Sequence, residues 1–119
     1  MTKQDFLARV DETTAGFQKH LAVADLPRGE TPVGLFLTIP HSGWLEPHVF
    51  WFPWASKRIR LESAAVYLSA AVKESPVLVF ARPDSRAFFD RLESFGIVRY
   101  VGRIDGIYDG MGWLYQARV

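Results

Sequence analysis

Cysteine is absent from this chain of 119 residues. Its absence excludes disulfide bonds, thiolate metal sites and cysteine nucleophiles, and it leaves the redox state of the compartment open. The histidines His20, His41 and His48 lack the spacing of metal ligands on one helix or strand pair, so we predict no metal site. The sequence also has no P-loop, no dinucleotide-binding glycine motif and no serine nucleophile elbow, and it therefore gives no support to phosphoryl transfer or hydrolysis.

A strong excess of charge is absent as well. Fourteen Lys and Arg residues against thirteen Asp and Glu residues leave a formal net charge of +1, which gives no global attraction to nucleic acid or to anionic lipid. Arg99 and Arg103 flank Tyr100, and this small basic and aromatic cluster leaves a local nucleic-acid contact open, although we do not expect one.

Long apolar segments are also missing. Residues 1–10 are charged and lack the apolar centre of a signal peptide, and no stretch approaches the ~20 apolar residues that a membrane-spanning helix requires. We therefore expect a protein that is not secreted, does not bind membranes, and works in the cytoplasm or enclosed in a particle. Hydrophobic residues make up 49% and charged residues 23%, which predicts one globular domain over residues 1–119.

Hydrophobic spacing predicts one helix and then a β-hairpin in the first half of the chain. A capping pattern near the N-terminus is followed by apolar residues at helical spacing, which predicts an amphipathic helix up to about His20. The segment 25–32 is rich in turn-forming residues and predicts a loop. Two β-prone runs, 33–39 and 47–52, surround a turn at 41–44 and predict a hairpin.

The second half alternates helices and strands. Ser56 is placed to cap a helix that extends to about Glu74. After a proline, the uninterrupted apolar run 77–81 is typical of a central strand covered on both faces. A second helix ends at Gly96, where a left-handed residue is expected. The last two predicted strands, which form a closing hairpin, are 97–104 and 113–119.

The predicted order from residue 33 onward resembles the GNAT acetyltransferase fold, an α/β fold with a mixed sheet flanked by helices. The most specific part is 84–104, DSRAFFDRLESFGIVRYVGRI. It is similar to the family's helix that ends in a Leu-Gly-Phe type turn, here Phe95-Gly96-Ile97, and leads into a strand. The stretch 46–56, EPHVFWFPWAS, more loosely resembles small phage-encoded members of this family. The likeness covers about residues 33–119 and implies an N-terminal part shortened to one helix.

The resemblance implies a place for acetyl-CoA, but the sequence departs from the family pattern there. In the family, acetyl-CoA lies between two splayed parallel strands, with its pyrophosphate on N–H groups at the start of the long helix. This position corresponds to Ser56, followed by the cations Lys57, Arg58 and Arg60, which could attract a phosphate. The family pattern resembles Arg-x-x-Gly-x-Gly or Ala, whereas 56–63, SKRIRLES, has no glycine and hinders close approach. Alternatively, these cations form a solvated helix end.

The family's acid and cofactor contacts are altered as well. The asparagine often seen near the start of the family's next helix corresponds to Ser85 or Asp84. The general acid, often a tyrosine four residues before the turn glycine, corresponds to Leu92, which cannot donate a proton. Glu46 or His48, at the start of the second hairpin strand, could act as the general base toward an amine. His48 equally fits an ordinary residue of a hairpin surface.

Aromatic residues are abundant, at 14% of the chain. The run 50–54, FWFPW, is unusual because adjacent residues on a strand point to opposite faces. Either helices cover both faces, or the run belongs to a partner-binding patch, since Trp is enriched at interface hot spots. The candidate interface residues are Trp44, Phe50, Trp51, Trp54 and Trp113. Trp44 and Trp113 would belong to the patch only if they are exposed.

These departures favour a GNAT-like pseudoenzyme with a degenerate acetyl-CoA site and no bound cofactor. It would serve as a structural or protein-binding component, and the resemblance to phage proteins implies a virion-associated role with a virion protein or a second copy as partner, in the host cytoplasm or in a phage particle. The alternative is an active acetyl-CoA-dependent N-acyltransferase with an atypical phosphate loop, in which Glu46 or His48 is the base and water replaces the acid. A third interpretation is a host-takeover protein that inhibits a bacterial enzyme.

Overall fold

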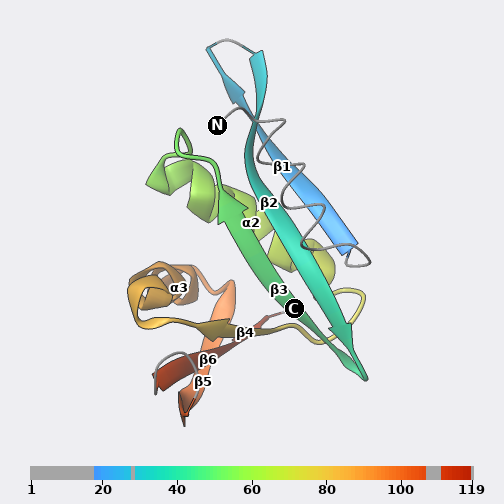
Figure 1. The fold of residues 1–119 in the computed structure, drawn as a ribbon, viewed down its shortest axis with the longest axis vertical. Coiled ribbons are helices and arrows are strands. Elements are labelled where there is room, and N and C mark those ends of the chain that lie inside the picture. Colours follow the sequence, from blue (N-terminus) through green and yellow to red (C-terminus); the bar gives the residue numbers. More distant parts are fainter. Residues whose placement is uncertain (1–17, 28, 107–110, 119) are drawn as a thin grey trace.

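The structure is a computed structural model that describes residues 18–27, 29–106 and 111–118 (Figure 1). Its strands form two antiparallel sheets, with the orders β1-β2-β3 and β4-β6-β5. The elements are β1 (Gln18–Leu26), β2 (Gly29–His41), β3 (Trp44–Trp51), α2 (Lys57–Ala71), β4 (Leu78–Ala81), the 3-10 helix η1 (Pro83–Ser85), α3 (Arg86–Ser94), β5 (Val98–Asp105) and β6 (Met111–Ala117). The predicted α/β fold class is confirmed.

Two consecutive hairpins build the first sheet. Leu26 pairs with Gly29 at the end of the first hairpin, and His41 pairs with Trp44 at the end of the second. The second turn places Gly43 at a φ of 88°, a left-handed conformation that glycine adopts without a steric cost. The hairpin predicted over the second and third of these strands is confirmed, and both strands are longer than the sequence indicated.

The chain begins its described part with a strand, where the sequence predicted a helix and a loop. Of the helix expected up to about His20, residues 2–17 lie outside the described residues, and residues 18–20 belong to a strand. The loop expected over 25–32 is also wrong, because β1 extends through Leu26 and β2 begins at Gly29. Pairing along β2, which no local pattern in the sequence reveals, decides the conformation of this segment.

The second sheet places β6 between β4 and β5. Val77, just before β4, is completely buried and forms a single parallel bridge to Leu45 of β3. β4 therefore lies between β3 and β6, as predicted for a central strand. The closing hairpin is confirmed as well, because β5 and β6 are antiparallel partners.

The start of α2 and the end of α3 are where the sequence predicts them, whereas α2 ends at Ala71 rather than near Glu74, and the 3-10 helix η1 precedes α3. The Ser56 hydroxyl accepts a hydrogen bond from the N–H of Ile59 at 3.2 Å and so caps α2. Gly96 follows α3 at a φ of 77°, and the next N–H, of Ile97, donates to the carbonyl of Leu92 at 3.1 Å. Among the described residues, none of the helices combines the length and apolar character that crossing a membrane would require.

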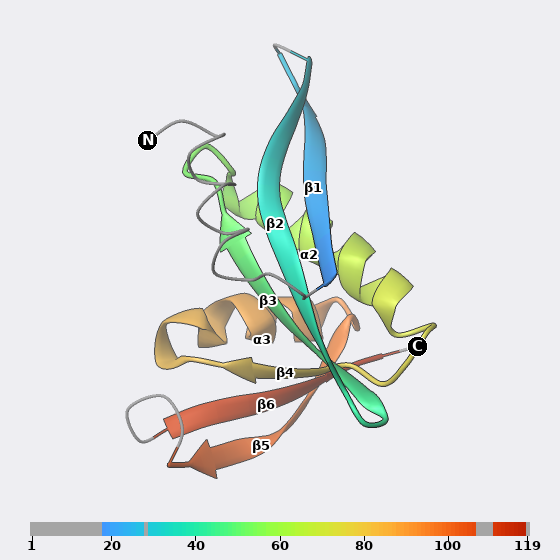
Figure 2. The same cartoon turned by 45° about the vertical axis from the view of Figure 1, so that its right-hand side comes forward.

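The core lies where α2 covers the first sheet and α3 lies beside the second (Figures 1 and 2). The rings of Phe36 on β2 and Tyr67 on α2 stack with centroids 4.2 Å apart, and the Tyr67 hydroxyl shares a hydrogen bond with Thr38. The largest completely buried side chains are Tyr115, Leu92, Val33, Val77 and Val98. The two sheets therefore share one continuous core.

Candidate functional site

β3 and β4 are parallel neighbours that separate after one bridge. The N–H of Leu45 donates to the Pro76 carbonyl at 2.8 Å, whereas the N–H of Phe52 donates toward β2, to the Val33 carbonyl, at 3.0 Å. Because backbone groups alternate between the two sides of a strand, odd-numbered positions of β3 face β4. The next odd position after Leu45 is Pro47, which has no N–H to donate. The ladder between the two strands therefore ends at Pro47.

Beyond this point the strands diverge, and a cleft of about 420 Å³ lies between them. Figure 1 shows the two sheets close together at one end and open toward α3. The exposed edge of β3 presents the carbonyl of Pro47 and both backbone groups of Val49 to this space. Apolar side chains from β2, β3, β4, α2 and α3 form most of the lining, including Phe36, Val49, Leu68, Val79 and Phe88. The polar lining side chains are His48, Arg82, Asp84 and Ser85.

A hydrogen-bonded cluster stands at the end of the cleft where the strands meet. Both oxygens of Glu46 are engaged, one 2.9 Å from Nε2 of His41 and the other 2.6 Å from Nε2 of His48. The ring of His41 stacks on Trp44, with centroids 3.9 Å apart. Burial alone would raise the pKa of Glu46, but the hydrogen bonds from His48 and His41 outweigh it and hold the pKa below its ordinary value. Glu46 is therefore a carboxylate at neutral pH.

The structure thus brings together both predicted base candidates and adds His41. From the sequence, His41 was a turn residue and a histidine without metal-ligand spacing, and it was not a candidate for proton transfer. The signal that could have identified His41 is the tight turn. The turn pairs His41 with Trp44, so the side chain of His41 lies next to that of Glu46, which is two residues after Trp44. The described part of the chain contains no group of three or more His, Asp or Glu side chains arranged to hold a metal ion.

The turn before α2, where the family binds pyrophosphate, is closed by its own side chains. Ser56 accepts the N–H of Ile59 with its hydroxyl and the N–H of Arg60 with its carbonyl. Arg60 folds back so that its Nε donates to the Ala55 carbonyl at 2.9 Å. Arg58 pairs with Glu62 at 2.9 Å on the exposed helix surface. Part of the anion-binding capacity of this helix end is therefore used within the chain.

Next to this turn, a groove of about 860 Å³ separates the start of α2 from α3. Four cations line it, and Asp84 and Phe88 belong to both the groove and the cleft, so the two spaces adjoin. The carboxyl groups of Glu62 and Asp84 partly offset the positive charge. The cations are Lys57, Arg58, Arg60 and Arg91. Of the predicted cofactor residues, Lys57, Arg58 and Arg60 thus line the groove, and Ser85 lines the cleft.

No tyrosine lines the cleft among the described residues. Leu92, at the position of the family's acid, is 1% exposed and belongs to the core. Tyr115 is completely buried on β6 and donates to Asp90 of α3. Burial and the hydrogen bond to Asp90 raise the pKa of Tyr115 far above its usual value. It is a structural phenol, held away from the cleft.

The predicted interface residues do not form one surface. Trp113 is only 8% exposed, so the condition under which it would add to a patch is not met. Trp51 packs edge-on against Phe36 and Phe88 and is partly buried against the core. Trp54 and Phe50 are 43% and 38% exposed, and Trp54 also donates to the Pro32 carbonyl at 2.8 Å. Part of the aromatic run thus serves the cleft and the core.

Solved structures of acetyltransferases resemble this chain, although no protein-family model and no curated protein sequence matches it. A GNAT-family acetyltransferase from Bacillus anthracis aligns with a TM-score of 0.69 and 16% identity, over 98% of this chain and 74% of the other. A provisionally assigned acetyltransferase from Sphaerobacter thermophilus aligns with a TM-score of 0.59 and 14% identity, over 100% and 90%. A provisionally assigned GNAT-family acetyltransferase from Bordetella pertussis aligns with a TM-score of 0.62 and 11% identity, over 99% of this chain and 78% of the other. The chain therefore has the fold of the GNAT acetyltransferases.

Proposed function

We propose that this protein binds an acyl-CoA in the cleft between β3 and β4 and transfers the acyl group to an amine. The observation that carries this proposal is the open cleft itself, about 420 Å³ in volume, with an unpaired strand edge along one wall and a hydrogen-bonded Glu-His cluster at one end. An extended amide chain can pair with such an edge. The carbonyl of Pro47 and the backbone groups of Val49 would hold it.

The positive charge of the groove beside the cleft suits the phosphate groups of such a ligand. The backbone of the adjoining turn before α2 does not, because it has no glycine. Lys57, Arg60 and Arg91 supply cations, and cationic side chains bind phosphate through charge-assisted hydrogen bonds. They would replace the close backbone approach that glycines permit in the family. Arg60 already donates a hydrogen bond to the Ala55 carbonyl, so we expect this turn to bind phosphate less strongly than a glycine-containing turn.

The Glu-His cluster supports one assignment of the proton-transfer roles. Nε2 of His48 faces the Glu46 carboxylate at 2.6 Å, and a carboxylate only accepts, so Nε2 carries the proton and Nδ1 holds a lone pair. His48, which lines the cleft, would take the proton from the amine through Nδ1. Glu46 is then a positioning residue that orients the imidazole and stabilises its charged form. A bound acyl-CoA would supply the electrophilic thioester carbon: the amine nitrogen would form the amide bond, the C–S bond would break, and the departing thiolate would take its proton from water.

The first test is thermal unfolding of the purified protein with and without millimolar acetyl-CoA. A ligand that binds only the folded state raises the midpoint in a concentration-dependent way. Transfer is then followed as thiol release with a panel of amines, an assay that is free of background from the protein because the chain has no cysteine. His48→Ala should retain the thermal shift and lose most of the thiol release, while His20→Ala, on β1, is the matched control. Absence of a shift at saturating acetyl-CoA would refute the proposal.

The glycine-free turn favours a second candidate, a protein that keeps the fold but binds a protein partner and performs no transfer. Here Ser56 and Arg60 close the phosphate turn within the chain, and the exposed Trp54 and Phe50 would contact the partner. A virion protein in a phage particle or in the host cytoplasm is the context that the sequence resemblance suggested. An unchanged unfolding midpoint with acetyl-CoA, together with specific capture of a partner that Trp54→Ala abolishes, would establish this candidate in place of the first.

A further inference from the structure

The two sheets end in edge strands that differ in their protection. Edges of sheets tend to pair with other chains unless charges, bulges or covering side chains prevent it. At the β5 edge, the Glu93 side chain accepts the N–H of Tyr100 at 2.6 Å, the ladder is interrupted by a bulge at Val101, and Arg99 and Arg103 add charge. β5 is therefore blocked against pairing.

Among the described residues, the β1 edge differs from β5, because its outward charges, Lys19 and Asp25, lie near its two ends and no bulge falls on β1 itself. No described strand pairs with its outer side. β1 continues for nine residues, and the bulge in its ladder lies on the β2 side, at Val33. The centre of the strand, residues 21–24, is uncharged, and Leu21 and Val23 are 37% and 49% exposed. An exposed edge of this length with apolar side chains at its centre is a template for another strand.

The direction of the β1 backbone groups follows from the first hairpin. Two residues connect β1 to β2, so the flanking pair, Leu26 and Gly29, is a hydrogen-bonded pair. Even-numbered positions of β1 therefore direct their N–H and C=O groups toward β2, and odd-numbered positions direct theirs outward. The outward positions are Lys19, Leu21, Val23 and Asp25.

These four outward positions are complementary to themselves. In an antiparallel pair of two β1 strands centred on Ala22, Lys19 lies opposite Asp25 of the second copy, and Leu21 lies opposite Val23 of the second copy. Both are pairs of outward positions, as a hydrogen-bonded antiparallel pair requires. The twofold axis repeats each pair, so the register unites two pairs of opposite charge and two apolar pairs. A shift of the centre by one residue, to Leu21 or to Val23, loses both charge pairs.

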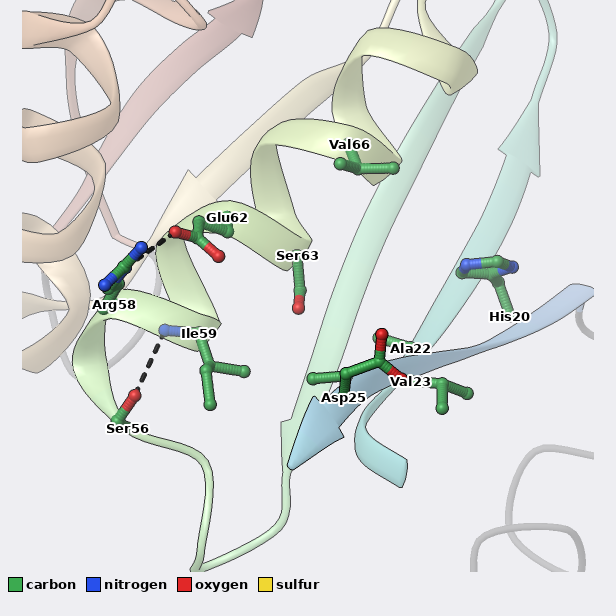
Figure 3. Close-up of a pocket in the computed structure, with 11 residues that line it drawn as sticks. His20, Ala22, Val23, Asp25, Ser56, Arg58, Ile59, Glu62, Ser63 and Val66 are labelled. Atoms are coloured by element: carbon green, nitrogen blue, oxygen red, sulfur yellow. Dashed lines mark hydrogen bonds and ion pairs between the residues drawn. The ribbon is translucent and has the colours of Figure 1, made fainter. Parts of the chain in front are cut away.

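The surface beside the edge has the shape for a second copy as well. A groove of about 650 Å³ separates β1 from α2. Figure 3 shows Ser63 and Val66 on the α2 side and Ala22, Val23 and Asp25 on the β1 side. Val66 is 70% exposed, which is unusual for a valine in the interior of a helix. A second β1 on this edge would bring a second α2 alongside and cover both valines.

We propose that two copies of this chain associate through their β1 edges, in antiparallel register about Ala22, and so join the two β1-β2-β3 sheets into one six-stranded sheet. This inference does not depend on acyl-CoA binding, since the cleft lies on the other side of β2. The association places the two clefts at the outer ends of the joined sheet.

The charge pairs permit a swap experiment. Lys19→Asp and Asp25→Lys each place two like-charge pairs in the interface, and the double variant K19D/D25K restores two opposite-charge pairs. Sedimentation velocity over a concentration series should show a dimer for the native protein, at least about tenfold weaker association for each single variant, and recovery in the double variant. Circular dichroism and melting curves establish that each variant is folded.

A matched control and a second measurement test whether β1, and not β5, forms the interface. Val101→Lys introduces a charged side chain at an exposed position of β5 and should leave the association unchanged. Hydrogen exchange at the outward amides of Leu21 and Val23 should slow as the protein concentration rises. A native protein that is monomeric at all concentrations, an assembly that both single swaps leave intact, or one that Val101→Lys dissociates would overturn the proposal.

Discussion

Gly34 is the position where one added methyl group should disturb the candidate site most directly. Gly34 pairs with Trp51 across β2 and β3, and a Cβ at Gly34 would lie 2.6 Å from Cε3 and 2.8 Å from Cζ3 of that ring. The shorter distance is about 0.8 Å below ordinary contact at 3.4 Å. The ring cannot easily move, because it packs between Phe36 and Phe88, with centroids 5.6 and 6.1 Å away. Overpacking of this kind costs about 1–3 kcal/mol.

Urea denaturation of Gly34→Ala measures this cost, and thermal melting should show a midpoint lower by about 4 °C for each kcal/mol. Gly102→Ala on β5 is the matched control, since a Cβ there meets nothing within 4 Å and the change should be neutral or stabilising by less than about 1 kcal/mol. Trp51→Leu in the Gly34→Ala background should remove the penalty, as a double-mutant cycle reports. The reasoning would be refuted if Gly34→Ala were as harmless as Gly102→Ala, or if its penalty persisted without Trp51.

Two further predictions concern pH. The pKa of Glu46 is lowered in the folded state, so its ionised form favours folding above about pH 4.5, and this contribution is lost as the pH falls through the lower folded value. Glu46→Gln should flatten the pH dependence of the unfolding free energy as the pH falls below about 4.5; an unchanged slope would contradict the hydrogen-bonded cluster. The raised pKa of Tyr115 means that stability should decrease as the pH rises above about 10, where the unfolded phenol ionises. Tyr115→Phe should reduce that decrease, of which Tyr67 keeps a part because burial raises its pKa as well, and should cost about 1 kcal/mol at neutral pH, measured by urea denaturation, for the lost bond to Asp90.

The elements that the sequence predicted correctly are those with local signals. Ser56 caps α2 through its own hydroxyl, and Gly96 ends α3 in a left-handed conformation. The run 77–81 also shows its position directly, because a strand covered on both faces contains apolar residues at every position. Each of these signals depends on a few neighbouring residues, and none depends on a distant partner.

What the sequence did not predict depends on long-range pairing. The helix predicted up to about His20 overlaps the first three residues of β1, and these residues form a strand because they pair with β2. Glu46 and His48 were candidates one by one, but their joint engagement with His41 follows from the register of the second hairpin. The aromatic run was ambiguous for a similar reason, since Trp51 faces the interior only because Gly34 leaves room for its ring.

The cleft and the turn before α2 have different physical origins, and this difference decides what the absence of glycine from residues 56–63 means for function. The cleft exists because Pro47 cannot extend the ladder that Leu45 begins, and because β3 and β4 then diverge over α2. No glycine in the helix turn contributes to it. The turn governs how closely a phosphate approaches the backbone, a contact that the neighbouring cations can partly replace through their side chains. A chain of this fold can therefore lack the glycine pattern of the acetyltransferases at the turn while the open cleft and the Glu-His cluster at its end persist. For this reason the cleft, rather than the turn motif, is the better guide to function in this protein.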